Sequence, residues 1–224
     1  MRARRSRRAS GTILIIGLGR FGTSVAETLI EMGHEVLAVD EDETLVQKYA
    51  DDFTHTMQVD ATDPDALEQI GAGQFEKVIV AIGTDVEASI MTVLALSEAG
   101  VPNIWAKAIS RKHGQILERI GAHHVVYPER TMGERVAHTV AGNLYDYFEL
   151  EDDYAFARTR APEFTWGRSL TDSDVRRKCD VTVVGVKRDG APVTYAKADT
   201  MIEKDDQLIV SGRRSEVEKF CRLL

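Results

Sequence analysis

The sequence lacks several features that would indicate particular classes of protein. It contains no run of about 18 apolar residues, so no bilayer-spanning helix is expected and the chain is predicted to be soluble. Its only two cysteines, Cys179 and Cys221, do not have the spacing of a metal site or a redox motif. We therefore expect reduced, structural thiols and a cytoplasmic protein.

Positive charge is also scarce beyond the first eight residues. The formal net charge is −8, and five arginines fall within residues 1–8, so removing their five charges leaves −13 on the rest of the chain. Nucleic-acid binding requires clustered Lys and Arg on a folded face, so this acidic body argues against nucleic acid as a partner. Residues 1–10 are expected to form a disordered, solvated basic arm, with weak contact to an anionic membrane surface as the alternative.

A regular alternation of strand-like and helix-like segments runs from residue 12 to about 129. Nearly continuous apolar strands that alternate with helices are typical of a parallel sheet covered on both faces. The predicted fold class is therefore α/β, with a doubly wound, Rossmann-like parallel sheet of six strands. The expected strands are Thr12–Ile16, Glu35–Asp40, Phe53–Asp60, Lys77–Gly83, Asn103–Ala108 and His123–Tyr127.

The most informative segment is a glycine turn, Gly17-Leu18-Gly19-Arg20-Phe21-Gly22, between the first strand and its helix. Gly17 permits the tight turn, Gly19 lets backbone amides approach a pyrophosphate, and Gly22 allows the helix to pack closely on the sheet. The helix N-terminus then faces the phosphates. Asp40, 18 residues after Gly22, can accept hydrogen bonds from both ribose hydroxyls and would repel a 2′-phosphate. The segment favours an adenosine nucleotide such as NAD or ATP over NADP.

Ligands of an open parallel sheet bind at the carboxyl ends of its strands, where the winding reverses. Arg20 and Lys107 can reach phosphate oxygens there as charge-assisted donors, and the turn Asp60-Ala61-Thr62 can contact the adenine edge. The predicted nucleotide-binding residues at these ends are Gly17, Leu18, Gly19, Arg20, Phe21, Gly22, Asp40, Glu41, Asp60, Ala61, Thr62, Ala81, Ile82, Gly83 and Lys107.

Groups for catalysis are not evident in this pattern. Hydride transfer needs a proton donor or acceptor beside the nicotinamide, and no histidine has a convincing position for that role. We therefore expect the nucleotide to be a regulatory ligand and the protein not to be an enzyme. An NAD-dependent oxidoreductase and an NADH/NAD redox sensor are the alternatives. The histidines considered are His34, His55, His113, His123, His124 and His138.

Residues 131–150 are predicted to form a linker or crossover helix between two domains. Apolar residues recur every four positions from Met132 to Phe148, which predicts one apolar helical face from Thr131 to about Phe148. Such a helix can pack on its own domain or cross to a partner subunit. Residues 11–130 would form the nucleotide-binding domain. Residues 151–224 would form a small α+β lobe, too small for an ordinary catalytic cleft, with Ser215 and Glu218 spaced as a capping box for a final helix.

These motifs together resemble the RCK (regulator of potassium conductance) family. They are ILIIGLGRFG, LAVDED, VDATD, VIVAIG, NIWAKA and IGAHHVVYPERTMGERVA, followed by a small β-rich lobe. The resemblance covers residues 11–224 and is strongest to the KtrA-like and TrkA-like potassium-uptake regulatory subunits. Its most specific part is the segment 127–133 at the exit of the sixth strand, because the glycine turn alone would suit many dehydrogenases.

The resemblance implies a non-enzymatic gating subunit at the inner face of the cell membrane. It would assemble as a ring of dimers, commonly an octamer, beneath a KtrB-like or TrkH-like membrane potassium transporter, with ATP activating and ADP inactivating. Arg20 would approach the terminal phosphates, either of the nucleotide in its own subunit or of the nucleotide in a neighbouring subunit. Glu129 matches an acid associated with a cation near the γ-phosphate and joins the predicted nucleotide-binding residues; the cation would be Mg²⁺ or another hard cation.

The C-terminal lobe resembles RCK-C, which in several KtrA-like proteins binds cyclic di-AMP at a dimer interface. The resemblance assigns this second ligand to Leu170, Arg176, Val181 and Thr182, with Arg176 contacting phosphate. The chain departs from the family pattern at two points. Thr182 stands where relatives often have asparagine, and the segment 195–198 contains no proline.

Overall fold

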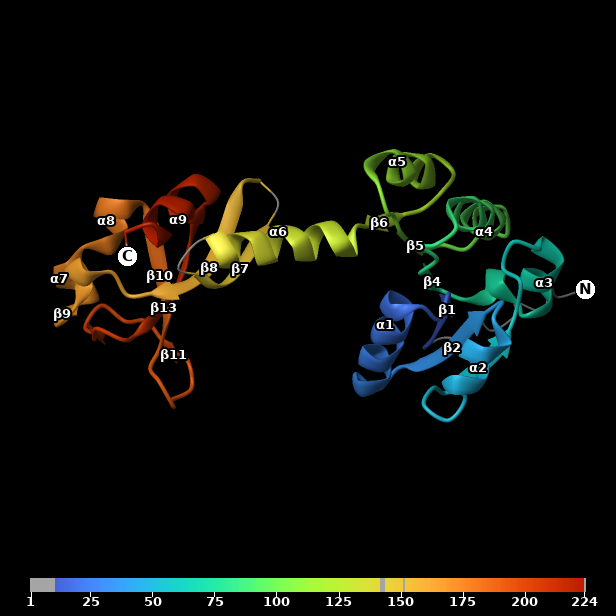
Figure 1. The fold of residues 1–224 in the computed structure, drawn as a ribbon, viewed down its shortest axis with the longest axis horizontal. Coiled ribbons are helices and arrows are strands. Elements are labelled where there is room, and N and C mark those ends of the chain that lie inside the picture. Colours follow the sequence, from blue (N-terminus) through green and yellow to red (C-terminus); the bar gives the residue numbers. More distant parts are fainter. Residues whose placement is uncertain (1–10, 142–143, 151, 224) are drawn as a thin grey trace, which may run out of the picture. The chain divides into compact units, whose positions relative to one another are not determined.

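The chain folds into two compact units, Met1–Glu129 and Arg130–Leu224 (Figure 1). The structure is a computed structural model that describes residues 11–141, 144–150 and 152–223. The predicted basic arm, residues 1–10, lies outside these described residues. No helix within the described ranges is long and apolar enough to cross a membrane.

The first unit contains the predicted parallel sheet. Its six strands lie in the order β3-β2-β1-β4-β5-β6, and each neighbouring pair is parallel. The winding reverses between β1 and β4, where this fold class has its ligand crevice. The predicted fold class is confirmed. The elements are β1 (Thr12–Ile16), α1 (Arg20–Glu31), β2 (Glu35–Asp40), α2 (Glu43–Lys48), β3 (His55–Gln58), α3 (Pro64–Gln69), η1 (Ala72–Gln74), β4 (Val78–Val80), α4 (Val86–Glu98), β5 (Ile104–Lys107), α5 (Arg111–Arg119) and β6 (His124–Val126).

Helices cover the two faces of this sheet unequally. One face packs against α3, α4 and α5, and the other against α1 and α2. On the second face a row of paired residues crosses the sheet from Ile15 through Ile79 and Trp105 to His124. Ile15 is fully buried, whereas Trp105 is 37% exposed and its ring stacks on His124 with centroids 4.1 Å apart. Among the described residues, the β5–β6 end of this face therefore has no helix over it.

Aspartate side chains cap the N-termini of α3 and α4. Asp63 accepts a hydrogen bond from the Asp65 backbone N–H, with Pro64 in the first position of α3. Asp85 likewise accepts from Ala88 at the start of α4. Each cap satisfies a backbone donor that has no partner inside the helix. These local contacts fix where α3 and α4 begin.

The helix that follows β6 is shorter than the apolar spacing predicts. α6 spans Pro128–Ala141, and residues 144–150 form strand β7 (Leu144–Leu150) instead of further helical turns. β7 pairs antiparallel with β8, and it buries Leu144 and Tyr147 in the core of the second unit. Sheet pairing and burial therefore outweigh the four-residue spacing. The prediction of helix through residues 144–150 is wrong.

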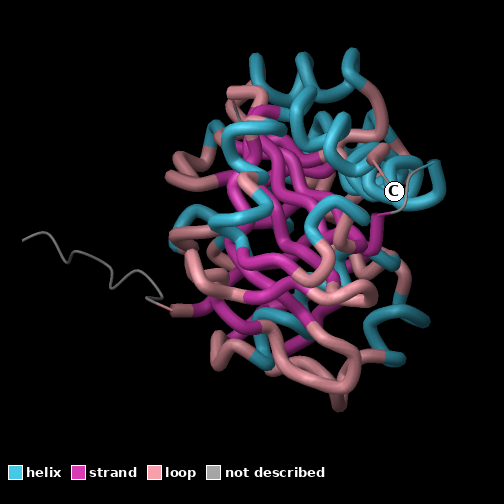
Figure 2. The backbone as a smooth tube through the Cα atoms, turned by 90° about the vertical axis from the view of Figure 1, so that its left-hand side faces the viewer, coloured by secondary structure: helices cyan, strands magenta, loops and turns pink. Residues whose placement is uncertain are grey.

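The second unit is built on an antiparallel sheet, as expected for a small α+β lobe. Its five strands have the order β11-β10-β13-β8-β7, beside a β12-β9 pair. The final helix is present without the predicted capping box, because the Ser215 hydroxyl bonds Glu216 and Glu218 pairs with Arg214. Figure 2 distinguishes these strands from the helices. The elements are β8 (Tyr154–Arg160), η2 (Glu163–Thr165), β9 (Arg168–Ser169), α7 (Leu170–Ser173), α8 (Val175–Cys179), β10 (Val181–Lys187), β11 (Thr194–Tyr195), β12 (Met201–Ile202), β13 (Gln207–Arg213) and α9 (Arg214–Cys221).

We expect Cys221 to resist alkylation in the folded protein. Its side chain is 3% exposed, and burial raises the pKa of its thiol to about 11. A raised pKa withholds the reactive thiolate until high pH, so at pH 8 about one thiol in a thousand is ionised. Half-buried Cys179 should react first with iodoacetamide, and both should react in guanidinium, as peptide mass spectrometry would measure. Equal rates for the two in native buffer would contradict this burial.

Candidate functional site

The glycine turn at the carboxyl end of β1 has the close contacts that its residues require. Gly17 adopts a φ of +100°, and a Cβ there would lie 3.2 Å from the Ala81 carbonyl carbon of the β4 exit. A Cβ on Gly22 would clash with the Gly17 carbonyl oxygen. Gly19 differs, because it begins α1 as its N-cap and a Cβ there would meet no atom within 4 Å. The turn is thus tightly packed at Gly17 and Gly22 and open at Gly19.

The Asp40 carboxylate, at the end of β2, is hydrogen-bonded to this turn. Its Oδ2 accepts a hydrogen bond of 2.6 Å from the Leu18 backbone N–H, and its Oδ1 accepts one of 2.9 Å from Asp42. Each carboxylate oxygen keeps a further lone pair for a hydroxyl donor. The side chain is only half-buried, so a ligand can reach it. Asp40 therefore stands at the glycine turn with spare acceptor capacity for a diol.

The turn after β3 lies next to Asp40. The Val59 backbone N–H donates to the Asp40 carbonyl oxygen at 2.9 Å, which joins the exits of β2 and β3. Asp60 accepts from both the Thr62 hydroxyl and the Thr62 backbone N–H, and these bonds lower the pKa of its carboxyl. Glu41, by contrast, is exposed, and only its backbone carbonyl is engaged, by the Gln58 side chain. Asp60 is thus held as a rigid carboxylate.

Lys107 and Glu129 form an ion pair at the exits of β5 and β6. Lys107 Nζ lies 2.6 Å from Glu129 Oε1, with the lysine side chain 12% exposed and the glutamate 64% exposed. The Lys107 hydrogen bond lowers the pKa of the Glu129 carboxyl, and Arg20 adds a smaller electrostatic effect. Lys107 passes over Gly83, where a Cβ would lie 2.9 Å from Nζ, and its ammonium is 5.7 Å from the Phe21 ring. One ammonium thus joins the β4, β5 and β6 exits to the glycine turn.

The structure gathers most of the predicted nucleotide-binding residues at one end of the sheet. Ala81 and Ile82 lie against Gly17, Asp60 and Thr62 stand beside Asp40, and Ala61 is buried between them and the core. Arg20 is exposed in the first turn of α1. The Lys107–Glu129 contact is the feature that sequence reasoning missed. It could have been predicted from the sequence, because Lys107 ends β5, Glu129 follows β6, and these two strands are expected to be neighbours.

Acid–base and metal chemistry find little support among the described residues. No group of three or more His, Cys, Asp and Glu side chains there could hold a metal ion, so a cation at Glu129 would need ligand oxygens as well. His113 is 3% exposed, and burial lowers its pKa. Its Nδ1 accepts from the Ile109 backbone N–H. His113 therefore belongs to the buried interior of the first unit.

The residues assigned to a second ligand lie around α7, α8 and the start of β10. Arg176 is exposed on α8, and Leu170, the first residue of α7, is half-buried. Val181 is not accessible to a ligand, because it is 1% exposed and belongs to the core of the second unit. Thr182 is half-buried and pairs with Ser211. Arg176, Leu170 and Thr182 are the accessible members of this set.

Sequence comparison finds known domains in both units. The TrkA-N domain model matches residues 13–128 and the TrkA-C domain model residues 166–224. The Ktr system potassium uptake protein C of Bacillus subtilis (strain 168) is 40% identical over 207 residues, which cover 92% of this chain and 94% of that protein.

Structural comparison finds the same fold in larger proteins. The GsuK RCK domain has a TM-score of 0.68 at 18% identity, covering 94% of this chain and 47% of that one. The GsuK channel bound to NAD has a TM-score of 0.67 at 17% identity, covering 94% and 38%. This chain therefore spans less than half the length of those structures, whose likeness shows the fold. With both domain models matched and a 40% identical relative over nearly its whole length, the chain belongs to the RCK family of TrkA-N and TrkA-C domain proteins.

Proposed function

We propose that this protein is a non-enzymatic, nucleotide-sensing regulatory subunit of a Ktr/Trk-type potassium uptake system. The hydrogen bond between Leu18 and Asp40 carries the proposal, because it fixes a ribose-binding carboxylate against a phosphate-binding turn. Asp40 also disfavours a 2′-phosphate by charge repulsion. ATP would activate the system and ADP would inactivate it, through their different affinities for two shapes of an assembly.

The phosphate end of the site supports a sensor of phosphate number. Lys107 is a half-buried ammonium already paired with Glu129, and Arg20 is an exposed cation one residue past the open Gly19. A γ-phosphate can accept charge-assisted hydrogen bonds from these donors. Glu129 and phosphate oxygens together suit Mg²⁺ or another hard cation. The site therefore offers binding groups for a nucleotide and its phosphates.

Replacing Arg20 with alanine should weaken ATP more than ADP. Its guanidinium is exposed and free to meet a terminal phosphate, so we expect roughly a tenfold loss for ATP and less than about threefold for ADP, the former corresponding to about 1.4 kcal/mol. Calorimetric titration measures both constants. Arg119→Ala, at the end of α5, is the matched control and should change neither. Equal losses for both nucleotides in Arg20→Ala would contradict the assignment.

Ligand analysis separates this proposal from its alternatives. The GsuK channel has been seen with NAD, and Asp40 is compatible with NAD as well as with ATP and ADP. Protein purified without added nucleotide should release ATP or ADP on acid extraction, identified by mass spectrometry. NAD(H) as the sole bound nucleotide would favour an oxidoreductase or an NADH/NAD sensor instead.

The proposed assembly uses two apolar surfaces that a single chain leaves open. α6 has no buried residue, and its stripe Met132, Val136 and Val140 is 54%, 51% and 80% exposed. The stripe is about 12 Å long, close to the roughly 10–13 Å of the short strands β5 and β6. We propose that α6 of a second copy covers the face that carries Trp105. Such dimers would assemble into an octameric ring beneath a KtrB-like or TrkH-like membrane potassium transporter.

Cyclic di-AMP is the proposed inhibitory ligand of the C-terminal lobe. Arg176 is exposed on α8 beside half-buried Leu170 and Thr182, and a guanidinium can bind a phosphodiester. Titration of the full chain with cyclic di-AMP should give a saturable heat that Arg176→Ala reduces at least tenfold. Arg177→Ala is the control, because Arg177 is engaged by Asp174. No heat at tens of micromolar would remove this part of the proposal.

A further inference from the structure

A cavity lies between α3 and α4, and it runs from Pro64 at the start of α3 to Gly73 and Ala99 at the amino-terminal edge of the sheet. It has a volume of about 390 Å³ and is lined by α3, η1 and the C-terminal half of α4. Helices in this fold run antiparallel to the strands, so the C-terminal ends of α3 and α4 mark the amino-terminal edge of the sheet. Gly73 lies close to the end of α4, since a Cβ there would be 2.8 Å from the Ala99 carbonyl oxygen. Only a glycine allows this close approach of η1 to the end of α4.

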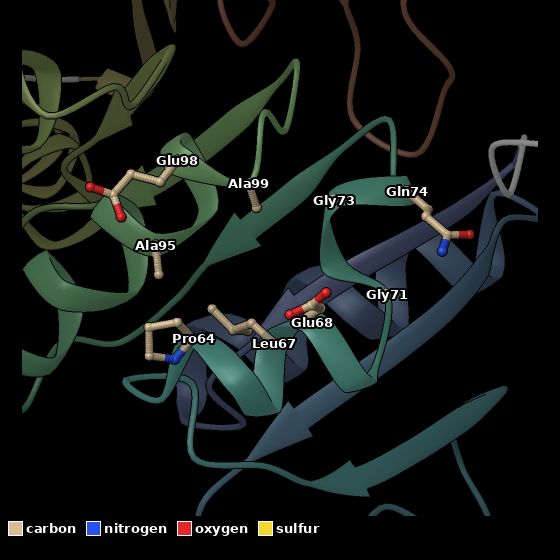
Figure 3. A pocket seen from close by; sticks show the side chains of 9 residues that line it. All are labelled: Pro64, Leu67, Glu68, Gly71, Gly73, Gln74, Ala95, Glu98 and Ala99. Atoms are coloured by element: carbon tan, nitrogen blue, oxygen red, sulfur yellow. The ribbon is translucent and has the colours of Figure 1, made fainter. Parts of the chain in front are cut away.

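The lining suits a cation with an apolar stem. Figure 3 shows Leu67 and Ala95 between α3 and α4, with Glu68 and Glu98 on the two helices. Gln74 adds an amide, and no Lys or Arg is among the lining residues. The C-terminus of α4 contributes further negative potential. Arginine side chains pack their methylenes on apolar surface while the guanidinium binds carboxylates.

The basic arm starts at this same edge of the sheet. β1 begins at Thr12, and the Leu14 backbone N–H donates to the Lys77 carbonyl oxygen just ahead of β4. η1, which lines the cavity, ends at Gln74, three residues before Lys77. The arm has ten residues, so it reaches at most about 33 Å. Five of those residues are arginines.

We propose that residues 1–10 dock in this cavity of their own copy, with arginines against its acidic rim of Glu68 and Glu98. Charge complementarity and the point from which the arm leaves the sheet carry the inference. The attraction would hold five positive charges against an acidic body and away from other anions. The proposal is independent of the nucleotide site, because none of the predicted nucleotide-binding residues lines the cavity.

Disulfide trapping tests this docking directly. Cysteines replace Ser6 in the arm and Gln74 on the rim, in a chain whose native Cys179 and Cys221 are changed to alanine. The matched control pairs Ser6→Cys with Glu31→Cys, because Glu31 ends α1 at the same edge but on the opposite face. We expect an intramolecular disulfide to form at least fivefold faster with Gln74→Cys than with Glu31→Cys. The added substitutions Glu68→Gln and Glu98→Gln, or 0.5 M NaCl, should remove the difference.

Three results would overturn the proposal. Equal rates for the two pairs would show an arm without a preferred site. Disulfides that link two chains, seen on non-reducing gels, would show that the arm docks on a second copy. No disulfide, together with sedimentation of the full chain but not of a chain starting at Ser10 on vesicles containing phosphatidylserine, would show a membrane contact. Hydrogen exchange gives an independent check, since residues 67–74 should exchange at least threefold faster in the chain starting at Ser10.

Discussion

Replacing Gly19 with alanine should leave the fold intact and still weaken nucleotide binding by roughly tenfold or more, about 1.4 kcal/mol. A Cβ at Gly19 meets no protein atom within 4 Å, and its φ of −70° suits any residue. The added methyl group would instead occupy the space through which a pyrophosphate approaches the backbone amides. We therefore expect an unchanged melting temperature and a weakened ATP affinity, measured by calorimetry.

Two further glycine-to-alanine variants serve as comparisons for this test. Gly22→Ala should lose both stability and binding, by about 1–3 kcal/mol in unfolding free energy, because its Cβ clashes with the Gly17 carbonyl oxygen. Gly133→Ala, where a Cβ also meets nothing within 4 Å, should change neither nucleotide affinity nor fold. If Gly19→Ala binds ATP as tightly as the unmodified chain, the nucleotide does not lie over this turn.

Placing a carboxylate on the α6 stripe should break the proposed assembly. Val136 is the middle of the stripe and is 51% exposed in the single chain, so Val136→Glu costs the isolated subunit little. In a covered interface an unpaired carboxylate costs several kcal/mol, and a two-fold symmetric contact contains it twice. We expect the unmodified chain to run as an oligomer of its 24.9 kDa subunit and Val136→Glu to run as a monomer at about 10 μM. Light scattering after gel filtration measures both.

Thr131→Glu is the matched control for this substitution. Thr131 is exposed on the same helix, about 140° around the axis from Val136, and the change adds the same charge. It should keep the oligomer. A Trp105→Ala variant should weaken the oligomer from the other side of the same contact, because Trp105 is the largest exposed side chain of the uncovered face. An oligomer that tolerates Val136→Glu would exclude α6 as its interface.

In the region after β6, the sequence pattern predicts the wrong secondary structure. Four-residue spacing from Met132 to Phe148 fits one helix, but β7 pairs with β8 from residue 144 onward. The spacing describes one segment alone, whereas the strand depends on pairing with β8 across a hairpin, from Leu150–Tyr154 to Leu144–Thr159. The capping box at Ser215 and Glu218 failed for a different reason, because α9 already begins at Arg214 and Ser215 is its second residue.

The sequence by itself determined the doubly wound sheet, the glycine turn, the acid at Asp40 and the family, because these depend on local spacing and on residue types with few conformational alternatives. Tertiary structure alone decided three other features. It joined Lys107 to Glu129, it left the Trp105 face uncovered, and it opened an acidic cavity between α3 and α4. Each of these brings together residues far apart in the chain, and their distances follow from strand order and helix packing.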